Sequence, residues 1–160
     1  MPEHELPRRK RLRLQGFDYS SASPYFVTVC THDRRPLFLD RQHGELALDC
    51  ILDGARDTGF AIIAVCVMPD HWHALVAPRA NSSQLGDMVR AAKGKATARL
   101  RASGITGRIW QAKFYDHVVR AEENLRQIAE YIVNNPVRKG MVVSAEDYPL
   151  AKIFPDAFPV

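Results

Sequence analysis

The chain has 160 residues, 46% of them hydrophobic, and a formal net charge of +4. This length and composition suit one domain that buries a sizeable core. No run of about 18 uncharged apolar residues occurs, so no membrane span is expected. The charged start, MPEHELPRRKRLRL, lacks the apolar stretch of a secretory signal. The three cysteines lack metal-type or redox-type spacing, which favours a reducing, cytoplasmic location.

The first half of the chain predicts three strands and one helix. Residues 24–33 (PYFVTVCTHD) are rich in β-branched and aromatic side chains, which predicts a strand. Residues 41–59 carry apolar side chains at near-helical spacing and end at a glycine, which predicts a helix. Residues 60–68 (FAIIAVCVM) have the apolar run of a buried strand. A Pro-Asp turn then leads into 71–78 (HWHALVAP), predicted to be a strand that pairs back on the previous one.

The second half predicts helices on either side of further strands. Residues 82–104 begin with serines suited to a helix N-cap and predict a basic helix, weakened at Gly94. Residues 109–120 (IWQAKFYDHVVR) predict one or two strands. Residues 122–135 predict a helix that ends before Pro136, because the residue before a proline avoids helical geometry. The order β-α-β-β-α-β-α favours an α+β fold, specifically a ferredoxin-like antiparallel sheet with helices packed on one face.

Positive charge is concentrated in two segments. Five of the six residues from Arg8 to Arg13 are basic, within a segment 1–20 that we expect to be a basic tail. For this tail, a solvated surface is an equally good interpretation. The stretch from Met88 to Tyr115 has no acidic residue and seven basic ones: Arg90, Lys93, Lys95, Arg99, Arg101, Arg108 and Lys113. Such a field attracts a polyanion, and nucleic acid is the commonest one, so we expect these seven side chains to bind it.

Two histidines interrupt the apolar strand expected at 71–78. Side chains alternate along a strand, so His71 and His73 project from one side and Trp72 from the other. Their β-carbons would lie about 6.6 Å apart, close enough for both imidazoles to bind one metal ion. The alternative is that both are core residues with hydrogen-bond partners of their own. The pair by itself leaves both interpretations open.

Other residues are candidates for the same site. Asp70 lies in the turn before the histidines, where a carboxylate is usually turn chemistry. His117 is a lone strand histidine that we interpret as structural, and Tyr115 is in phase with it.

The helix expected at 122–135 is more informative. Its apolar stripe consists of Leu125, Ile128, Ala129 and Ile132. At 100° per residue, Tyr131 lies about 120° from the middle of that stripe, and Asn135 about 40° from Tyr131. Tyr131 is therefore not a core residue of this helix, and it shares a side with an amide able to bind a metal. A half-buried tyrosine with its hydroxyl in water is the alternative.

Several segments together resemble a known family. MPDHWH resembles the His-hydrophobic-His element of the HUH endonucleases, and YIVNNPVRKG resembles the tyrosine helix of their single-tyrosine transposases. YFVTVCTHDRRPLF, WQAKFYDHVVR and EDYP resemble the branch called REP-associated tyrosine transposases, relatives of insertion-sequence transposases. The resemblance runs from about Tyr25 to Pro149. We therefore expect residues 21–150 to be the transposase domain and 151–160 a C-terminal tail.

The resemblance implies a metal-dependent endonuclease and strand transferase that acts on single-stranded DNA, often near hairpins. It implies that His71 and His73 bind the metal and that Tyr131 is the nucleophile, forming a 5′-phosphotyrosine. Asn135 stands where relatives often carry a glutamine ligand, and is the expected third ligand. The family points to Mg²⁺ or Mn²⁺, whereas imidazole ligands alone would suggest zinc. The family contains monomers and dimers with exchanged helices, so a homodimer is one expectation. The enzyme is expected to act at the nucleoid.

Two other functions compete with this one. A small-molecule metallohydrolase would use Asp70, His71 and His73, with His117 as a further candidate, and would activate water instead of a tyrosine. A non-enzymatic nucleic-acid-binding module would only pack the histidines. Its binding would depend on Arg90, Lys93, Lys95 and Arg99, and would fall steeply with salt.

Overall fold

The computed structural model of the chain describes residues 23–120 and 122–159. The basic tail expected at 1–20 lies outside the described residues. The strands are β1 (Tyr25–Cys30), β2 (Phe60–Met68), β3 (His71–Pro78), β4 (Tyr115–Val118) and β5 (Ala151–Ile153). The helices are α1 (Arg41–Asp57), α2 (Leu85–Ala102), α3 (Leu125–Val133) and the one-turn α4 (Asn135–Arg138). In this part of the chain no helix combines the length and the apolar character needed to cross a bilayer.

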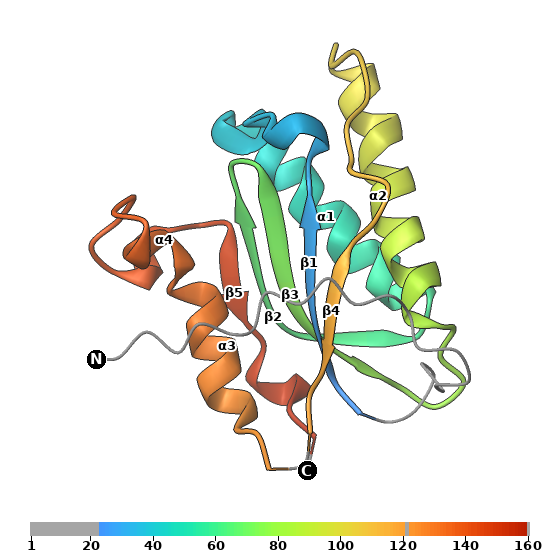
Figure 1. The fold of residues 1–160 in the computed structure, drawn as a ribbon, viewed down its shortest axis with the longest axis vertical. Helices are drawn as coiled ribbons and strands as arrows, with labels where there is room; N and C mark the ends of the chain where they lie inside the picture. Colours follow the sequence, from blue (N-terminus) through green and yellow to red (C-terminus); the bar gives the residue numbers. More distant parts are fainter. Residues whose placement is uncertain (1–22, 121, 160) are drawn as a thin grey trace.

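The strands form one antiparallel sheet in the order β4-β1-β3-β2-β5 (Figure 1). The hairpin of β2 and β3 lies at its centre, and every residue of β2 is buried. The α+β class, the antiparallel sheet and the predicted order of elements are confirmed. β5 falls in the segment 151–160, where a tail was expected. It is held to β2 by Tyr148, whose hydroxyl donates to the Val67 carbonyl at 2.6 Å, and by the Val67 amide, which donates to Leu150.

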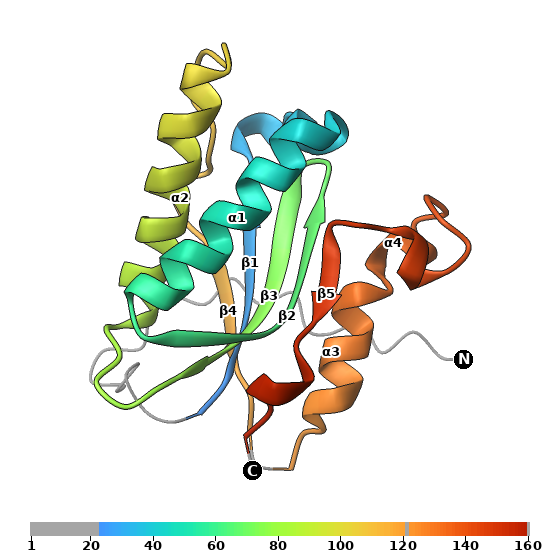
Figure 2. The same ribbon diagram turned by 180° about the vertical axis from the view of Figure 1, so that it is seen from behind.

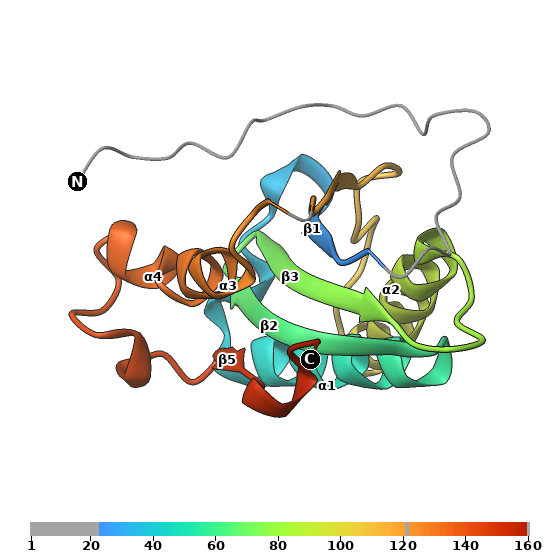
Figure 3. The same ribbon diagram turned by 90° about the horizontal axis from the view of Figure 1, so that it is seen from below.

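The helices cover the sheet from two sides. α1 and α2 pack against each other on one face, as expected (Figure 2). α3 lies on the other side, against β2, β3 and β5, so the expectation that the helices pack on one face is wrong (Figure 3). The amphipathic pattern explains this position, because the apolar stripe of α3 buries Ile128, Ala129 and Ile132 on the sheet. Both faces of β2 are thus covered, which explains why its sequence is a continuous apolar run.

Two helix boundaries differ in detail from the sequence prediction. The serines at 82 and 83 precede α2 but do not cap it. Gln84 is the N-cap of a capping box with Asp87, three residues further on. The backbone amide of Gln84 donates to the Asp87 carboxylate, and the Gln84 side chain accepts from the backbone amide of Asp87. α3 ends at Val133, just before Pro136 as predicted, but the chain then makes another helical turn as α4 with the proline inside its first turn.

The close packing of α1 on α2 depends on Gly54. A β-carbon at this position would lie 2.8 Å from the Ala92 backbone nitrogen, whereas one at Gly94 on α2 would meet nothing within 4 Å. We expect Gly54→Ala to lower the free energy of unfolding by about 1–3 kcal/mol through overpacking. Gly94→Ala, the matched control, should raise it by about 0.5–1 kcal/mol, since alanine favours a helix. Urea unfolding measures both; equal effects of the two variants would contradict this packing.

Candidate active site

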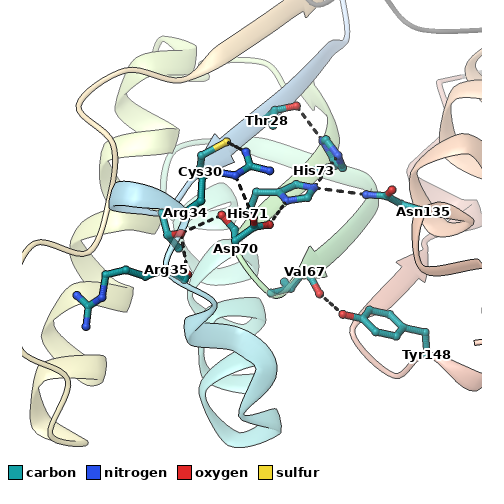
Figure 4. Close-up of polar contacts among 11 residues, drawn as sticks. Thr28, Cys30, Arg34, Arg35, Val67, Asp70, His71, His73, Asn135 and Tyr148 are labelled. Atoms are coloured by element: carbon teal, nitrogen blue, oxygen red, sulfur yellow. Dashed lines mark hydrogen bonds and ion pairs between the residues drawn. The ribbon is translucent and has the colours of Figure 1, made fainter. Parts of the chain in front are cut away.

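The two histidines meet on the sheet face that carries α3 and α4 (Figure 4). The Nε2 atoms of His71 and His73 lie 3.1 Å apart, and the rings are nearly perpendicular, at 73°. Trp72 between them is 1% exposed and faces the other side. The rings therefore converge as the alternation of a strand predicts.

The outer nitrogen of His71 is held by the turn that precedes it. Its Nδ1 lies 2.7 Å from Oδ1 of Asp70, whose Oδ2 accepts a hydrogen bond from Arg34 Nε at 3.0 Å. The turn itself is fixed by Thr31, because its amide and its hydroxyl both donate to the Asp70 carbonyl. Because a carboxylate only accepts, Nδ1 of His71 carries the hydrogen and Nε2 keeps a free lone pair.

His73 is oriented by the neighbouring strand. In the β1–β3 register it lies opposite Thr28, whose hydroxyl is 2.8 Å from His73 Nδ1. A hydroxyl can donate or accept, so it supports either tautomer of this ring. It donates when His73 Nε2 carries the hydrogen and bonds to His71, and it accepts when His73 Nε2 is left free to bind a ligand.

Both imidazoles are neutral at neutral pH. Burial lowers the pKa of His73 to about 3, and the neighbouring His71 and the charges of Arg138 and Arg34 act in the same direction. Burial also lowers the pKa of His71, although Asp70 opposes the shift. For Asp70, burial would raise the pKa, but its hydrogen bond from His71 and the nearby charges lower it below its ordinary value. The site thus contains two neutral nitrogen donors and an ionised carboxylate behind one of them.

Asn135, the first residue of α4, brings an amide to the same point. It is 5% exposed, and its Nδ2 is 3.4 Å from His71 Nε2. The two ends of a carboxamide exchange by a half-turn of the side chain, which places Oδ1 in the same position. Two adjacent ligands of an octahedral ion with bonds of about 2.1 Å lie about 3.0 Å apart. The 3.1 Å between the imidazole nitrogens matches that spacing, so these side chains fit a divalent ion.

The remaining candidates lie apart from this cluster. His117 on β4 bonds to both oxygens of Glu123, at 2.9 and 3.0 Å, which is a structural pairing. Tyr115 lies opposite Thr28 in the β1–β4 register and is 37% exposed. No three His, Cys, Asp or Glu side chains of the described residues gather as a metal site. Asn135 is the residue beside the two histidines that adds an amide, which has an oxygen able to bind a metal.

Tyr131 lies one helical turn before Asn135, on α3, and is half-buried. The guanidinium carbon of Arg138 lies 3.7 Å from the centre of its ring. The Tyr131 hydroxyl makes no hydrogen bond to another residue in the described ranges. Within this chain α3 packs on β3, so the tyrosine helix lies on the sheet that carries the histidines.

Comparison with known proteins assigns this arrangement to a family. The family model described as "Transposase IS200 like" matches residues 20–135, most of the chain. The chain belongs to this family. Transposases cleave and rejoin DNA, so the protein is an enzyme of that class, and the family expected from the sequence is confirmed.

Individual relatives point to one branch of these transposases. The REP-associated tyrosine transposase of Escherichia coli is 29% identical over 138 residues, covering 86% of this chain and 81% of that protein. A Haemophilus influenzae protein provisionally given the same name is 26% identical over 153 residues, 87% and 84% of the two chains. The structure of a REP-associated tyrosine transposase bound to a REP hairpin superposes with a TM-score of 0.71 and 28% identity, over 88% of this chain and 82% of that one.

The seven basic residues expected to bind DNA differ in how their side chains are engaged. Four of them have a partner within the chain: Arg90 pairs with Asp87, Lys95 with Asp57, Lys93 with the Gln111 carbonyl and Arg99 with the Cys50 sulfur. Burial also lowers the pKa of Lys93. Arg101, Arg108 and Lys113 are exposed, without a side-chain hydrogen bond or ion pair to another described residue.

Sequence reasoning missed the cations nearest the histidines. Arg34 pairs with Asp70, and the charges of Arg34 and Lys139 both lower the pKa of His71. Arg138 acts on His73 in the same direction. The only signal for Arg138 was its spacing, seven residues after Tyr131 and on the same helical face. Nothing in the sequence indicated Arg34, because its position depends on Asp33 and Arg34 both adopting left-handed φ angles, 53° and 54°.

The carboxylate behind His71 should control the affinity of the site for metal. We expect Asp70→Ala to weaken Mn²⁺ binding about 10- to 100-fold, because His71 loses the partner that fixes its tautomer and raises its basicity. Glu123→Gln is the control: it removes the carboxylate from His117 and should leave the affinity unchanged. Titration followed by electron paramagnetic resonance measures both. Equal affinities in Asp70→Ala and the unaltered protein would contradict this role.

Proposed function

We propose that this transposase cleaves and rejoins single-stranded DNA at hairpin-associated repeats, with Mg²⁺ or Mn²⁺ held by His71, His73 and Asn135 and with Tyr131 as nucleophile. The observation that carries the proposal is the convergence of two neutral imidazole nitrogens, 3.1 Å apart, on an amide one helical turn after a tyrosine. The REP hairpin in the related structure supports this choice of substrate. We place the reaction in the cytoplasm, at the nucleoid.

The chemistry conserves the number of phosphoester bonds. The Tyr131 oxygen attacks phosphorus, the bond from phosphorus to the 3′ oxygen breaks, and the phenol proton ends on the released 3′-hydroxyl. The product is a 5′-phosphotyrosine, and attack by another 3′-hydroxyl reverses the step and joins strands without an external energy source. A divalent ion at the histidines would withdraw charge from the phosphate and stabilise the charge that develops.

The protein's own groups prepare the site for an anion. Both histidines are neutral, so their protons do not compete with a cation, and Asp70 and Thr28 orient them. The three donors carry no charge, so a bound cation keeps its full attraction for a phosphate. Arg34, Arg138 and Lys139 add positive charge around them.

We propose that one chain completes the site. Asn135 lies against His71 of the same chain, and α3 is packed on the sheet that carries both histidines. A homodimer is then not required for the reaction. The alternative of a small-molecule metallohydrolase is weakened, because His117, the fourth residue proposed for its site, is paired with Glu123.

Removing the nucleophile should separate cleavage from binding. We expect Tyr131→Phe to abolish the covalent protein–DNA adduct, because the attacking oxygen is gone, while hairpin affinity stays within about twofold. Tyr115→Phe, which alters the exposed tyrosine nearest the site on the sheet, is the matched control and should form adduct normally. Each variant is incubated with a labelled hairpin oligonucleotide and Mn²⁺, and the yield of covalent adduct is measured on a denaturing gel. Normal adduct yield in Tyr131→Phe would move the nucleophile elsewhere.

The exposed basic residues should provide salt-dependent binding. We expect replacing Arg101, Arg108 and Lys113 with glutamine to reduce the slope of log affinity against log salt by up to about 2, near 0.7 for each phosphate that the protein no longer neutralises. Lys95→Gln should change it less, because that ammonium is already paired with Asp57 at 2.9 Å. Fluorescence anisotropy at several salt concentrations measures the slopes. An unchanged slope in the triple variant would place DNA on another surface.

A further inference from the structure

Arg138 covers one face of the Tyr131 ring. Its guanidinium carbon lies 3.7 Å from the ring centroid, which is stacking contact, and its side chain forms no ion pair within the described part of the chain. Arg138 is exposed and Tyr131 half-buried, so this contact lies at the surface of the protein. Such contacts depend on the attraction of a cation for the electron-rich ring face.

The break between α3 and α4 sets this contact. At Asn134 the backbone leaves helical geometry, with φ −87° and ψ 1°, and Pro136 supplies no amide hydrogen. The ladder then resumes, because the Arg138 amide donates to the Asn134 carbonyl and the Lys139 amide to that of Asn135, both at 3.0 Å. Positions 131, 135 and 138 therefore remain on one side of the helical segment.

We propose that Arg138 is a positioning residue for Tyr131: its guanidinium holds the phenol ring in orientation and places a positive charge against its face. This inference rests on the proposed role of Tyr131 as nucleophile. Negative charge that develops on the phenol oxygen spreads into the ring, so a cation over the ring favours the attacking form. Arginine suits both tasks, because its planar group stacks and stays charged, whereas lysine supplies a charge without the stack.

Two other roles for Arg138 predict different kinetics. A residue that only contacted a DNA phosphate would change the dissociation constant and leave the rate at saturating DNA unaltered. A residue that only stabilised the fold would change the unfolding midpoint, and lysine would not be expected to restore the rate better than glutamine. A positioning residue changes the saturated rate and leaves affinity largely intact.

The test uses the full chain with Mn²⁺ and a labelled hairpin oligonucleotide, under single-turnover conditions at saturating DNA. We expect Arg138→Gln to slow adduct formation about threefold to thirtyfold, the range that a cation–π contact supports. Arg138→Lys should recover part of that loss. Arg126→Gln is the matched control, because Arg126 stacks at 4.9 Å over Phe158, an aromatic ring remote from the site, and this variant should react at the normal rate.

Each outcome decides the inference. A normal saturated rate in Arg138→Gln overturns it, as does a loss confined to the dissociation constant, or equal rates for the glutamine and lysine variants. If Tyr131→Phe still forms adduct, the proposed function itself has failed. If Tyr131→Phe is inactive while Arg138→Gln is normal, only the role of Arg138 is wrong. Urea unfolding of each variant separates slow chemistry from loss of folded protein.

Discussion

Two imidazoles that meet nitrogen to nitrogen inside a sheet place the strictest constraint on this structure. His71 and His73 can face each other at 3.1 Å only while at least one of them is neutral, because two imidazolium rings at that distance would repel each other. Burial enforces neutrality, and Asp70 and Thr28 fix the outer nitrogens. Those two partners come from the β2–β3 turn and from β1, so the register of three strands determines the geometry of one pair of rings.

The second constraint is the junction of α3 and α4. The apolar stripe of α3 fixes the helix on β2, β3 and β5, and the break at Asn134 turns Asn135 towards His71. The same break returns Arg138 over Tyr131. The positions of Tyr131, Asn135 and Arg138 thus depend on one helical segment. The short edge strand β5, held by the Tyr148 hydrogen bond, supports that segment.

The sequence predicted much of this architecture for identifiable physical reasons. Apolar runs and helical spacing gave the three central strands and the long helices, and strand alternation placed both histidines on one side. β5 was missed, because three residues carry no pattern, and so was the Gln84 cap, because serines stood just before it. The partner of His73 could not be predicted, since Thr28 reaches it only through the β1–β3 register. Charge counting also failed to show that Asp57, from α1, neutralises Lys95 on α2.

The central claim is that the two histidines and Asn135 hold a divalent ion beside the tyrosine helix. A crystal structure of Tyr131→Phe with Mn²⁺ and a hairpin oligonucleotide, with anomalous data at the manganese edge, tests it most directly. The account predicts one anomalous peak about 2.1 Å from Nε2 of both His71 and His73, with the Asn135 amide oxygen and a phosphate oxygen also bound to it. A peak elsewhere, or histidines that remain hydrogen-bonded to each other beside bound DNA, would contradict it.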